Sequence, residues 1–186
     1  MRRLFVVYCA LFLACGGGKK TDYPITPTPF TDVTLTDSFW NYRLEKNHNV
    51  TIPTDFKKCE ETGRIENFEI AGGLKKGAFV SGLPFDDSDV YKIMEGAAYS
   101  LSIFPDPKLE KYLDDLIAKV AAAQERDCYL MTWRTIDASK PPTSWAGDEK
   151  RWSNTKDGHE LYNVGHMYEA AVAHYLATGK KTFLKV

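Results

Sequence analysis

The chain of 186 residues is 44% hydrophobic and 26% charged, a composition typical of a globular protein that buries a core. Its formal net charge of −1 gives no electrostatic basis for binding nucleic acid, so we expect no nucleic-acid partner. Aromatic residues make up 13% of the chain, a share that packing in the core explains more simply than stacking on sugar rings.

Residues 1–15 have the pattern of an export signal. Arg2 and Arg3 precede an apolar run from Leu4 to Ala14 that is too short to span a bilayer. Cys15 and GGGKK follow, which resembles a bacterial lipoprotein signal, in which cleavage before the cysteine leaves its thiol to carry lipid. We therefore predict that Cys15 is a lipid anchor and that the protein is held on a membrane of a bacterial cell envelope, in the periplasm or at the cell surface. A plain secretory signal cut nearby is the alternative.

Residues 16–30, GGGKKTDYPITPTPF, predict a flexible tether because they are rich in glycine, threonine and proline. The folded part is then expected over residues 31–186, beginning with a short extended segment, since FTDVTLTDSFW alternates apolar and polar side chains. Once the signal is removed, Cys59 and Cys128 remain. The sequence does not decide whether they form a disulfide, and two buried free thiols are the preferred interpretation.

Two segments in the middle of the chain predict helices. Within residues 88–104 apolar side chains recur at steps of three and four, with Ser88 or Asp87 as a possible N-cap. Asp106 is expected to cap the next helix, with Pro107 at its first position. Isolated amphipathic helices of this kind have to pair to bury their apolar faces.

A third helix is expected from His159 to Thr178, with Gly179 as its C-cap. The preceding residues 127–157 contain two adjacent prolines, three tryptophans and many polar residues. They predict a long irregular segment, and long loops are often functional.

Three of the four histidines lie in this third helix, in the stretch HELYNVGHMYEAAVAH. At about 100° per residue, His159 and His166 point almost the same way as Tyr162, but two turns separate them, which is too far for one ion. His166 and Glu169 have a spacing that could hold a metal, yet they are half a site that no sequence signature completes, so we expect no metal site in this chain. For His159, a hydrogen bond to a hydroxylated ligand and a satisfied core histidine are the two interpretations.

A second polar cluster is FDDSDVYK at residues 85–92, with three aspartates at a helix start. Attraction to the positive end of the helix dipole explains one or two of these carboxylates. A role toward sugar hydroxyls or a cation remains open for the others. They lie too close in sequence to flank a glycosidic bond as an acid and base pair.

Five stretches, taken in order, resemble glycoside hydrolase family 127, the β-L-arabinofuranosidases and their relatives. They are DVTLTDSFW (32–40), CEETGRIENF (59–68), FDDSDVYKIMEGAAYSL (85–101), PDPKLEKYLDDLIAKVAAAQ (105–124) and HELYNVGHMYEAAVAHYLATGK (159–180). The resemblance implies an all-α fold, here an incomplete (α/α)6 barrel of helical hairpins with a central sugar cavity. It implies exo-acting hydrolysis of terminal arabinofuranosyl units in an arabinose-containing oligosaccharide or polysaccharide.

The resemblance also implies site residues. His159 opens the family's H-E-x-Y motif, whose histidine contacts the sugar, and Asp87, Asp89 and His166 are further candidates for binding substrate. The family is a retaining glycosidase with a cysteine thiolate nucleophile, a zinc ion bound by cysteines and a glutamate, and a separate glutamate as acid/base. All of these lie C-terminal to the stretches present here, and Cys128, which replaces the glycine of the family's D-G-Y-L, is no substitute.

We therefore expect zinc in the intact enzyme but no catalytic residue and no metal ligand in this chain. The sequence is interpreted as an N-terminal fragment or truncated product, inactive by itself, of an exported glycosidase. One alternative is a surface lipoprotein that binds glycan without catalysis, through His159, the aspartates and Trp133, Trp145 or Trp152. The other is a nonfunctional truncated remnant.

Overall fold

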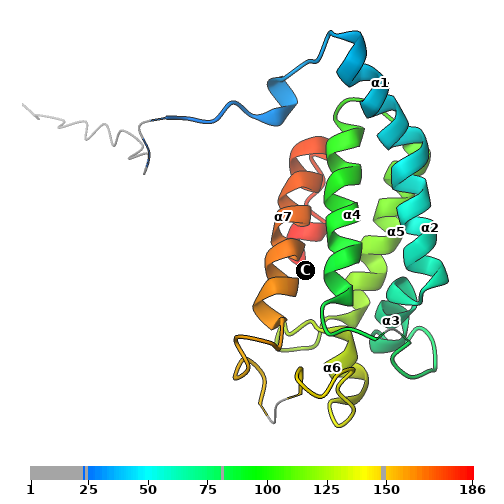
Figure 1. Cartoon of the computed structure of the whole chain (residues 1–186), viewed down its shortest axis with the longest axis vertical. Helices are drawn as coiled ribbons and strands as arrows, with labels where there is room; N and C mark the ends of the chain where they lie inside the picture. The colour runs from blue at the N-terminus through cyan, green and yellow to red at the C-terminus, as the bar shows by residue number, and fades with distance from the viewer. Residues whose placement is uncertain (1–22, 24, 81, 148–149) are drawn as a thin grey trace, which may run out of the picture.

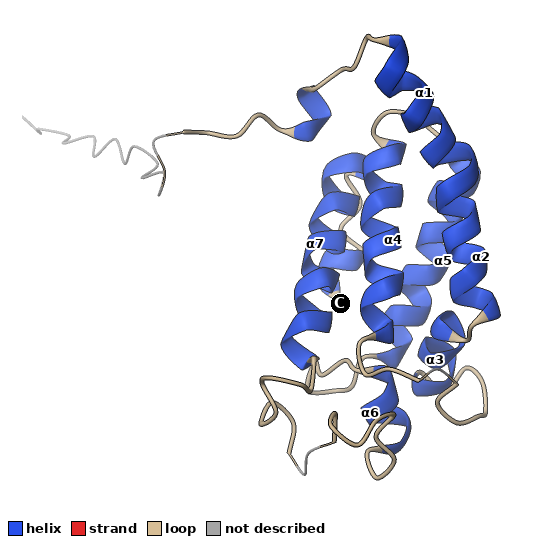
Figure 2. Cartoon of the chain, viewed as in Figure 1, coloured by secondary structure: helices blue, strands red, loops and turns tan. Residues whose placement is uncertain are grey.

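The computed structural model describes residues 23, 25–80, 82–147 and 150–186, and in this part of the chain it consists of helices and loops without a strand (Figure 2). The predicted signal and anchor at residues 1–15 and most of the tether lie outside the described residues. Among the helices described, none is both long and apolar enough to cross a bilayer.

The first helices follow one another almost without a break: α1 (Ser38–Lys46), the π-helical turn η2 (Asn47–Thr51) and α2 (Ile52–Glu61) (Figure 1). The predicted extended segment is shorter than expected. A 3-10 turn, η1 (Phe30–Asp32), precedes it, and α1 already includes Phe39 and Trp40. The reason is a local cap, since the Asp37 carboxylate accepts a hydrogen bond from the backbone N–H of Trp40 at 2.8 Å.

The core is built around α4 (Asp86–Leu101), which packs against α7 (Glu160–Thr178) on one side and against α2, α3 (Arg64–Ala71) and α5 (Pro107–Ala123) on the other (Figure 1). The expected capping of α5 is confirmed, because the Asp106 carboxylate accepts from the N–H groups of Lys108 and Leu109 at 2.8 and 3.2 Å. The apolar stripe of α5 points into this core, where its buried members are Leu113, Leu116, Ile117 and Val120.

The start of α4 differs from the expectation that Ser88 or Asp87 caps it. The helix begins at Asp86, and its N-cap is Phe85, which offers no side-chain cap. Ser88 instead donates its hydroxyl back to the carbonyl of Phe85 at 2.7 Å, and Asp86 accepts from the N–H of Leu83 at 3.0 Å. The three aspartates thus fill the first turn rather than preceding it, where they favour the positive end of the helix dipole.

Helices α4 and α7 run in the same direction in a fixed register. Lys92 of α4 donates to Tyr162 of α7, and ligand atoms of Glu95 on α4 and His166 on α7 lie within 4.8 Å of one another, so positions about 70 residues apart in sequence face one another along both helices. Both helices carry small side chains, and Ala97 and Ala98 of α4 and Ala170 of α7 are fully buried. Small side chains let two helix axes approach closely, which fixes the register of the larger side chains around them.

Helix α7 spans the predicted residues, and Gly179 ends it at φ 73°, a left-handed conformation that glycine adopts without steric cost. Helix α7 lies at one edge of the helical layer in Figure 1 and exposes several large apolar side chains, namely Leu161, Tyr168, Val172 and Leu176. The predicted irregular segment 127–157 is interrupted by the short helix α6 (Thr132–Asp137).

Both remaining cysteines are free. Cys59 is buried, as preferred, and burial raises the pKa of its thiol to about 11, which keeps it protonated and unreactive. Cys128 is exposed, so the expectation of a buried thiol is wrong there. It lies in a turn at φ 69°, a backbone conformation that favours glycine and that turns its side chain to solvent.

Candidate functional site

A concavity of about 200 Å³ lies at the N-terminus of α7, and we refer to it as the α7 pocket. It is lined by Trp152, Asn154, Thr155, Lys156, His159, Glu160, Leu161 and Tyr162. Aromatic faces and polar side chains together suit a hydroxylated ligand, because rings cover apolar C–H faces while polar atoms exchange hydrogen bonds. Of the predicted site residues, His159 lines this pocket.

His159 is the N-cap of α7 and has φ 59°, in the left-handed region. This conformation costs a non-glycine residue about 1–2 kcal/mol, so the fold tolerates a local strain to keep an imidazole here. Its Nδ1 lies 2.7 Å from the carbonyl oxygen of Asp157. A carbonyl only accepts, so Nδ1 carries the proton, and in the neutral ring Nε2 is an acceptor for a ligand hydroxyl.

Three aromatic rings hold the imidazole of His159 in place. Phe85, Tyr162 and Trp145 lie with ring centroids 4.9, 5.7 and 5.8 Å from it. The three come from the loop before α4, from α7 and from the long irregular segment, so the ring is clamped by separate parts of the fold. A pre-oriented acceptor of this kind loses little entropy when a ligand binds.

The buried carboxylate of Glu160, the residue after His159, connects the irregular segment to α7 by hydrogen bonds. It accepts from the Tyr129 hydroxyl and from the backbone N–H of Trp152, both at 2.6 Å, and lies 3.7 Å from Nε of the buried Arg134. Burial and then the bond to Glu160 raise the pKa of Tyr129 well above its usual value, so its hydroxyl remains a donor. Glu160 therefore fixes one wall of the α7 pocket through Trp152.

Asp87 is 2% exposed and does not line the α7 pocket. Its two carboxylate oxygens accept from the backbone N–H of Thr132 at 2.8 Å and from the Thr132 hydroxyl. The carboxylate thereby fixes the start of α6 on α4. Burial is the main cause that raises the pKa of Asp87 from 3.8 to about 6, and the hydrogen bonds from Thr132 oppose that rise.

The raised pKa of Asp87 predicts a pH dependence of stability. The folded state binds the proton of the Asp87 carboxyl more tightly than the unfolded state does. The stabilisation that protonated Asp87 gives the folded state is therefore complete below about pH 4 and is lost as the pH rises through about 6. Relative to Asp87→Asn, the wild-type free energy of unfolding is expected to fall by up to about 3 kcal/mol over that range. Urea unfolding of both proteins at several pH values measures this difference.

The exposed Asp115, 60% accessible, gives a matched control. Asp115→Asn removes one negative charge from an exposed position and so controls for the change in net charge that Asp87→Asn also makes. A pH-independent difference between Asp87→Asn and the wild type would contradict the assignment, because it would place the same charge on Asp87 in the folded and unfolded states.

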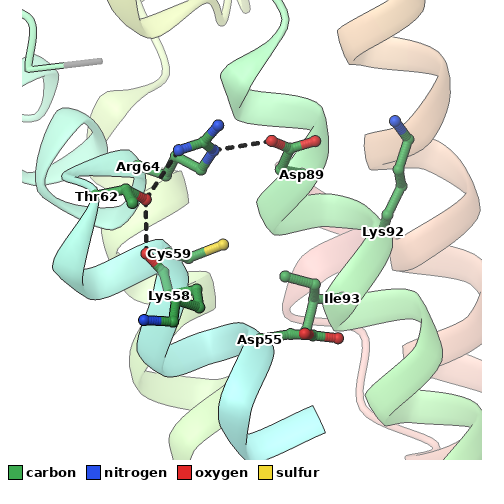
Figure 3. Close-up of a pocket in the computed structure, with 8 residues that line it drawn as sticks. All are labelled: Asp55, Lys58, Cys59, Thr62, Arg64, Asp89, Lys92 and Ile93. Atoms are coloured by element: carbon green, nitrogen blue, oxygen red, sulfur yellow. Dashed lines mark hydrogen bonds and ion pairs between the residues drawn. The ribbon is translucent and has the colours of Figure 1, made fainter. Parts of the chain in front are cut away.

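Asp89 lines a different concavity, a groove of about 410 Å³ between α2 and α4 (Figure 3). It is bounded by Asp55, Lys58, Cys59, Thr62, Arg64, Asp89, Lys92 and Ile93. Figure 3 shows the Asp89 carboxylate turned toward Arg64, whose Nε donates to it at 2.8 Å. The same guanidinium lies 3.0 Å from Asp86. Asp89 is thus occupied by an ion pair that joins α3 to α4.

Lys92 connects this groove to the α7 pocket. It lines the groove, and its ammonium donates to the Tyr162 hydroxyl at 2.5 Å and to the Ser88 hydroxyl at 3.3 Å. The Tyr162 ring in turn packs edge-on against His166, with centroids 4.7 Å apart. His159, Tyr162 and His166 therefore share one face of α7, as their spacing predicts, but His166 does not line the α7 pocket.

The zinc and thiolate chemistry implied by the family resemblance does not fit the residues described here. Cys59 is buried beside Arg64 with a raised thiol pKa, and Cys128 is exposed in a turn. In the part of the chain that the structure describes, the one group of side chains close enough to hold an ion contains neither cysteine.

Sequence reasoning missed Glu160, Tyr129 and Lys92 as parts of this region. Glu160 stands next to His159 in H-E-x-Y, and a glutamate at a helix start reads as a favourable dipole contact. Its burial, which is the signal of a larger role, depends on residues up to 31 positions away. A periodic pattern along one helix carries no information on such partners.

Comparisons with known proteins point in one direction. Residues 32–186 match the family described as β-L-arabinofuranosidase, GH127 catalytic domain. The non-reducing end β-L-arabinofuranosidase of Bifidobacterium longum subsp. longum is 33% identical, over 83% of this chain and 26% of that protein. A solved GH127 β-arabinofuranosidase is 53% identical with a TM-score of 0.79, over 88% of this chain and 26% of that one.

A second solved structure, a GH127 β-L-arabinofuranosidase from Geobacillus stearothermophilus, is 40% identical with a TM-score of 0.75, over 83% of this chain and 24% of that one. The chain thus spans about a quarter of the length of these proteins. The likeness confirms the predicted all-α fold, which is part of a helical barrel.

Proposed function

Since the chain belongs to the GH127 β-L-arabinofuranosidase catalytic-domain family, we propose that it forms the N-terminal part of an exported glycosidase. The substrates would be arabinose-containing glycans of the plant type, cleaved at terminal β-L-arabinofuranosyl or closely related residues. The observation that supports this assignment most directly is the α7 pocket, where a strained and clamped His159 presents Nε2 as an acceptor among aromatic rings.

In this proposal the chain's own residues bind and orient the sugar. A hydroxyl of the furanose donates to Nε2 of His159. The rings of Tyr162 and Trp152 cover the C–H faces of the sugar. Glu160 keeps the wall that carries Trp152 in position through the backbone N–H of that residue. Substrate contact by Asp89 and by His166 stays a prediction. In it, Arg64 would orient the Asp89 carboxylate and the Tyr162 ring would orient the His166 imidazole.

The nucleophile, the zinc ion and the acid/base that the family resemblance implies are proposed to come from outside residues 32–186. Bound zinc would lower the pKa of the nucleophilic cysteine thiol in the intact enzyme and so favour its thiolate form. The 186-residue chain by itself is then proposed to bind sugar without turning it over.

The experiment that tests the function compares hydrolysis with binding. The native gene product is assayed for release of the aryl alcohol from an aryl β-L-arabinofuranoside, and the 186-residue chain is titrated with L-arabinofuranosyl oligosaccharide by calorimetry. Turnover by the native product with binding by the chain supports the proposal. Binding without any turnover would favour a glycan-binding lipoprotein, and neither binding nor a cooperative melt would indicate a nonfunctional remnant.

We further propose that the chain is anchored in the cell envelope by lipid on Cys15. Cys15→Ala is expected to move the protein from the membrane fraction to the soluble fraction and to abolish the added lipid mass. Cys9→Ala, which changes a cysteine inside the apolar run, is the matched control and should stay with the membrane. Retention of Cys15→Ala on membranes would overturn the lipid anchor.

A further inference from the structure

A cluster of metal-ligating side chains lies on the shared face of α4 and α7, outside the α7 pocket. Glu95 of α4 and His166 and Glu169 of α7 each offer one ligand atom, and these atoms lie within 4.8 Å of one another. Glu95 and His166 are partly buried, whereas Glu169 is exposed. The side chains come from two helices that pack directly against each other, so their approach follows from the fold itself.

The two ligands on α7 have the spacing that places side chains one turn apart on the same helix face. Nδ1 of His166 lies 3.1 Å from Oε2 of Glu169. Two ligand atoms bound to one ion at about 2.0–2.2 Å, at tetrahedral to octahedral angles, are roughly 3.0–3.5 Å apart. The observed separation therefore matches two adjacent ligands of one ion.

Glu95 completes the set from the parallel helix and has a fixed orientation. The Tyr99 hydroxyl donates to its Oε1 at 2.6 Å, and the Tyr162 ring packs edge-on against His166. Contacts of this type orient the side chains that bind the ion in metal sites. The nearest ammonium on α4, that of Lys92, points to the hydroxyls of Tyr162 and Ser88.

We propose that Glu95, His166 and Glu169 bind one divalent transition-metal ion. One imidazole and two carboxylates suit zinc, manganese, iron or cobalt, and a doubly positive ion balances the two carboxylates, which one protonated histidine does not. Three protein ligands leave the remaining positions to water. A groove of about 390 Å³, with Glu95 and Glu169 in its lining, gives access from solvent.

This site contains no cysteine and is separate from the zinc and thiolate centre expected of the intact family member. It also stands independently of the sugar-binding role proposed for His159. Its occupant would tie α4 to α7, since it draws one ligand from the first helix and two from the second.

The test is a titration of the full chain with zinc by calorimetry and with cobalt by visible absorption, in a background of Cys9→Ser, Cys15→Ser and Cys128→Ser, which leaves the buried Cys59 as the remaining thiol. One ion per chain is expected, together with d–d bands in the visible spectrum. Glu169→Gln, at the exposed ligand, is expected to lower the affinity by at least about 100-fold, as is Glu95→Gln.

The matched control is Glu60→Gln. Glu60 holds the Tyr112 hydroxyl at 2.8 Å as Glu95 holds that of Tyr99, but no histidine joins it in such a cluster. Its zinc affinity should equal that of the parent. Circular dichroism and a cooperative melt establish that each variant is folded. Absence of stoichiometric binding by the folded parent, or binding that survives in folded Glu169→Gln and Glu95→Gln, would overturn the proposal.

Discussion

Replacing His159 by glycine is expected to lower kcat/KM of the native product for an aryl β-L-arabinofuranoside by roughly 10- to 100-fold. This range corresponds to about 1.4–2.7 kcal/mol, the cost expected when a bound sugar hydroxyl is left without its acceptor. Glycine relieves the strain at φ 59°, so the thermal midpoint should change little even though three ring contacts are lost. Activity and stability are thereby separated in one variant.

Cys128→Gly is the matched control, because it relieves a left-handed conformation at φ 69° outside the α7 pocket. Its kcat/KM should equal that of the wild type. If His159→Gly retained full kcat/KM, His159 would not contact the sugar. If its melt were lost, the imidazole would serve the fold, through the rings of Phe85, Trp145 and Tyr162, and not the ligand.

Glu160→Ala is expected to reduce the free energy of unfolding by about 3–5 kcal/mol. The carboxylate is buried, and its removal leaves the Tyr129 hydroxyl and the N–H of Trp152 without their acceptor beside the buried Arg134. Because Glu160 holds the backbone N–H of Trp152, the wall of the α7 pocket that carries Trp152 should loosen as well. Urea unfolding followed by circular dichroism measures the first effect.

A carboxylate in a more open setting serves as the comparison for Glu160. Glu125 lies 2.6 Å from Arg151 but is 28% exposed, so Glu125→Ala should cost at most about 1 kcal/mol. Comparable losses in the two variants would show that burial does not amplify the role of Glu160. Glu160→Gln retains a carbonyl acceptor and is expected to fall between the wild type and Glu160→Ala.

The parts of the fold that the sequence predicts well are those decided by neighbouring residues. The limits of α5 and α7 follow from a capping aspartate, a proline at the first position and a glycine after the last turn, all local signals. The end of the extended segment differs from the prediction because Asp37 caps α1, which takes Phe39 and Trp40 of the alternating pattern into the helix. Helices α2 and α3 lack such clear boundaries, since a π-helical turn leads directly into α2.

The candidate site was predictable to the same extent. The common face of His159, Tyr162 and His166 follows from helix geometry alone. The burial of Asp87 against Thr132 and the pairing of Asp89 with Arg64 depend on how separate helices pack, which no single-helix pattern contains. For the same reason, the sequence of α7 alone gives two of the proposed metal ligands, His166 and Glu169. The third, Glu95, lies on α4, and only the packing of the two helices shows that it is close to them.

The fixed register of α4 against α7 has a consequence for how the length of this chain can change in evolution. One residue inserted within either helix turns every later side chain by about 100° and advances it by about 1.5 Å, so the pairs Lys92–Tyr162 and Glu95–His166 would part together. Insertions at residues 138–157 leave both helices in phase, because that segment joins α6 to α7 and belongs to neither α4 nor α7. Length variation among relatives is therefore expected to gather in that loop and to be nearly absent from the two helices.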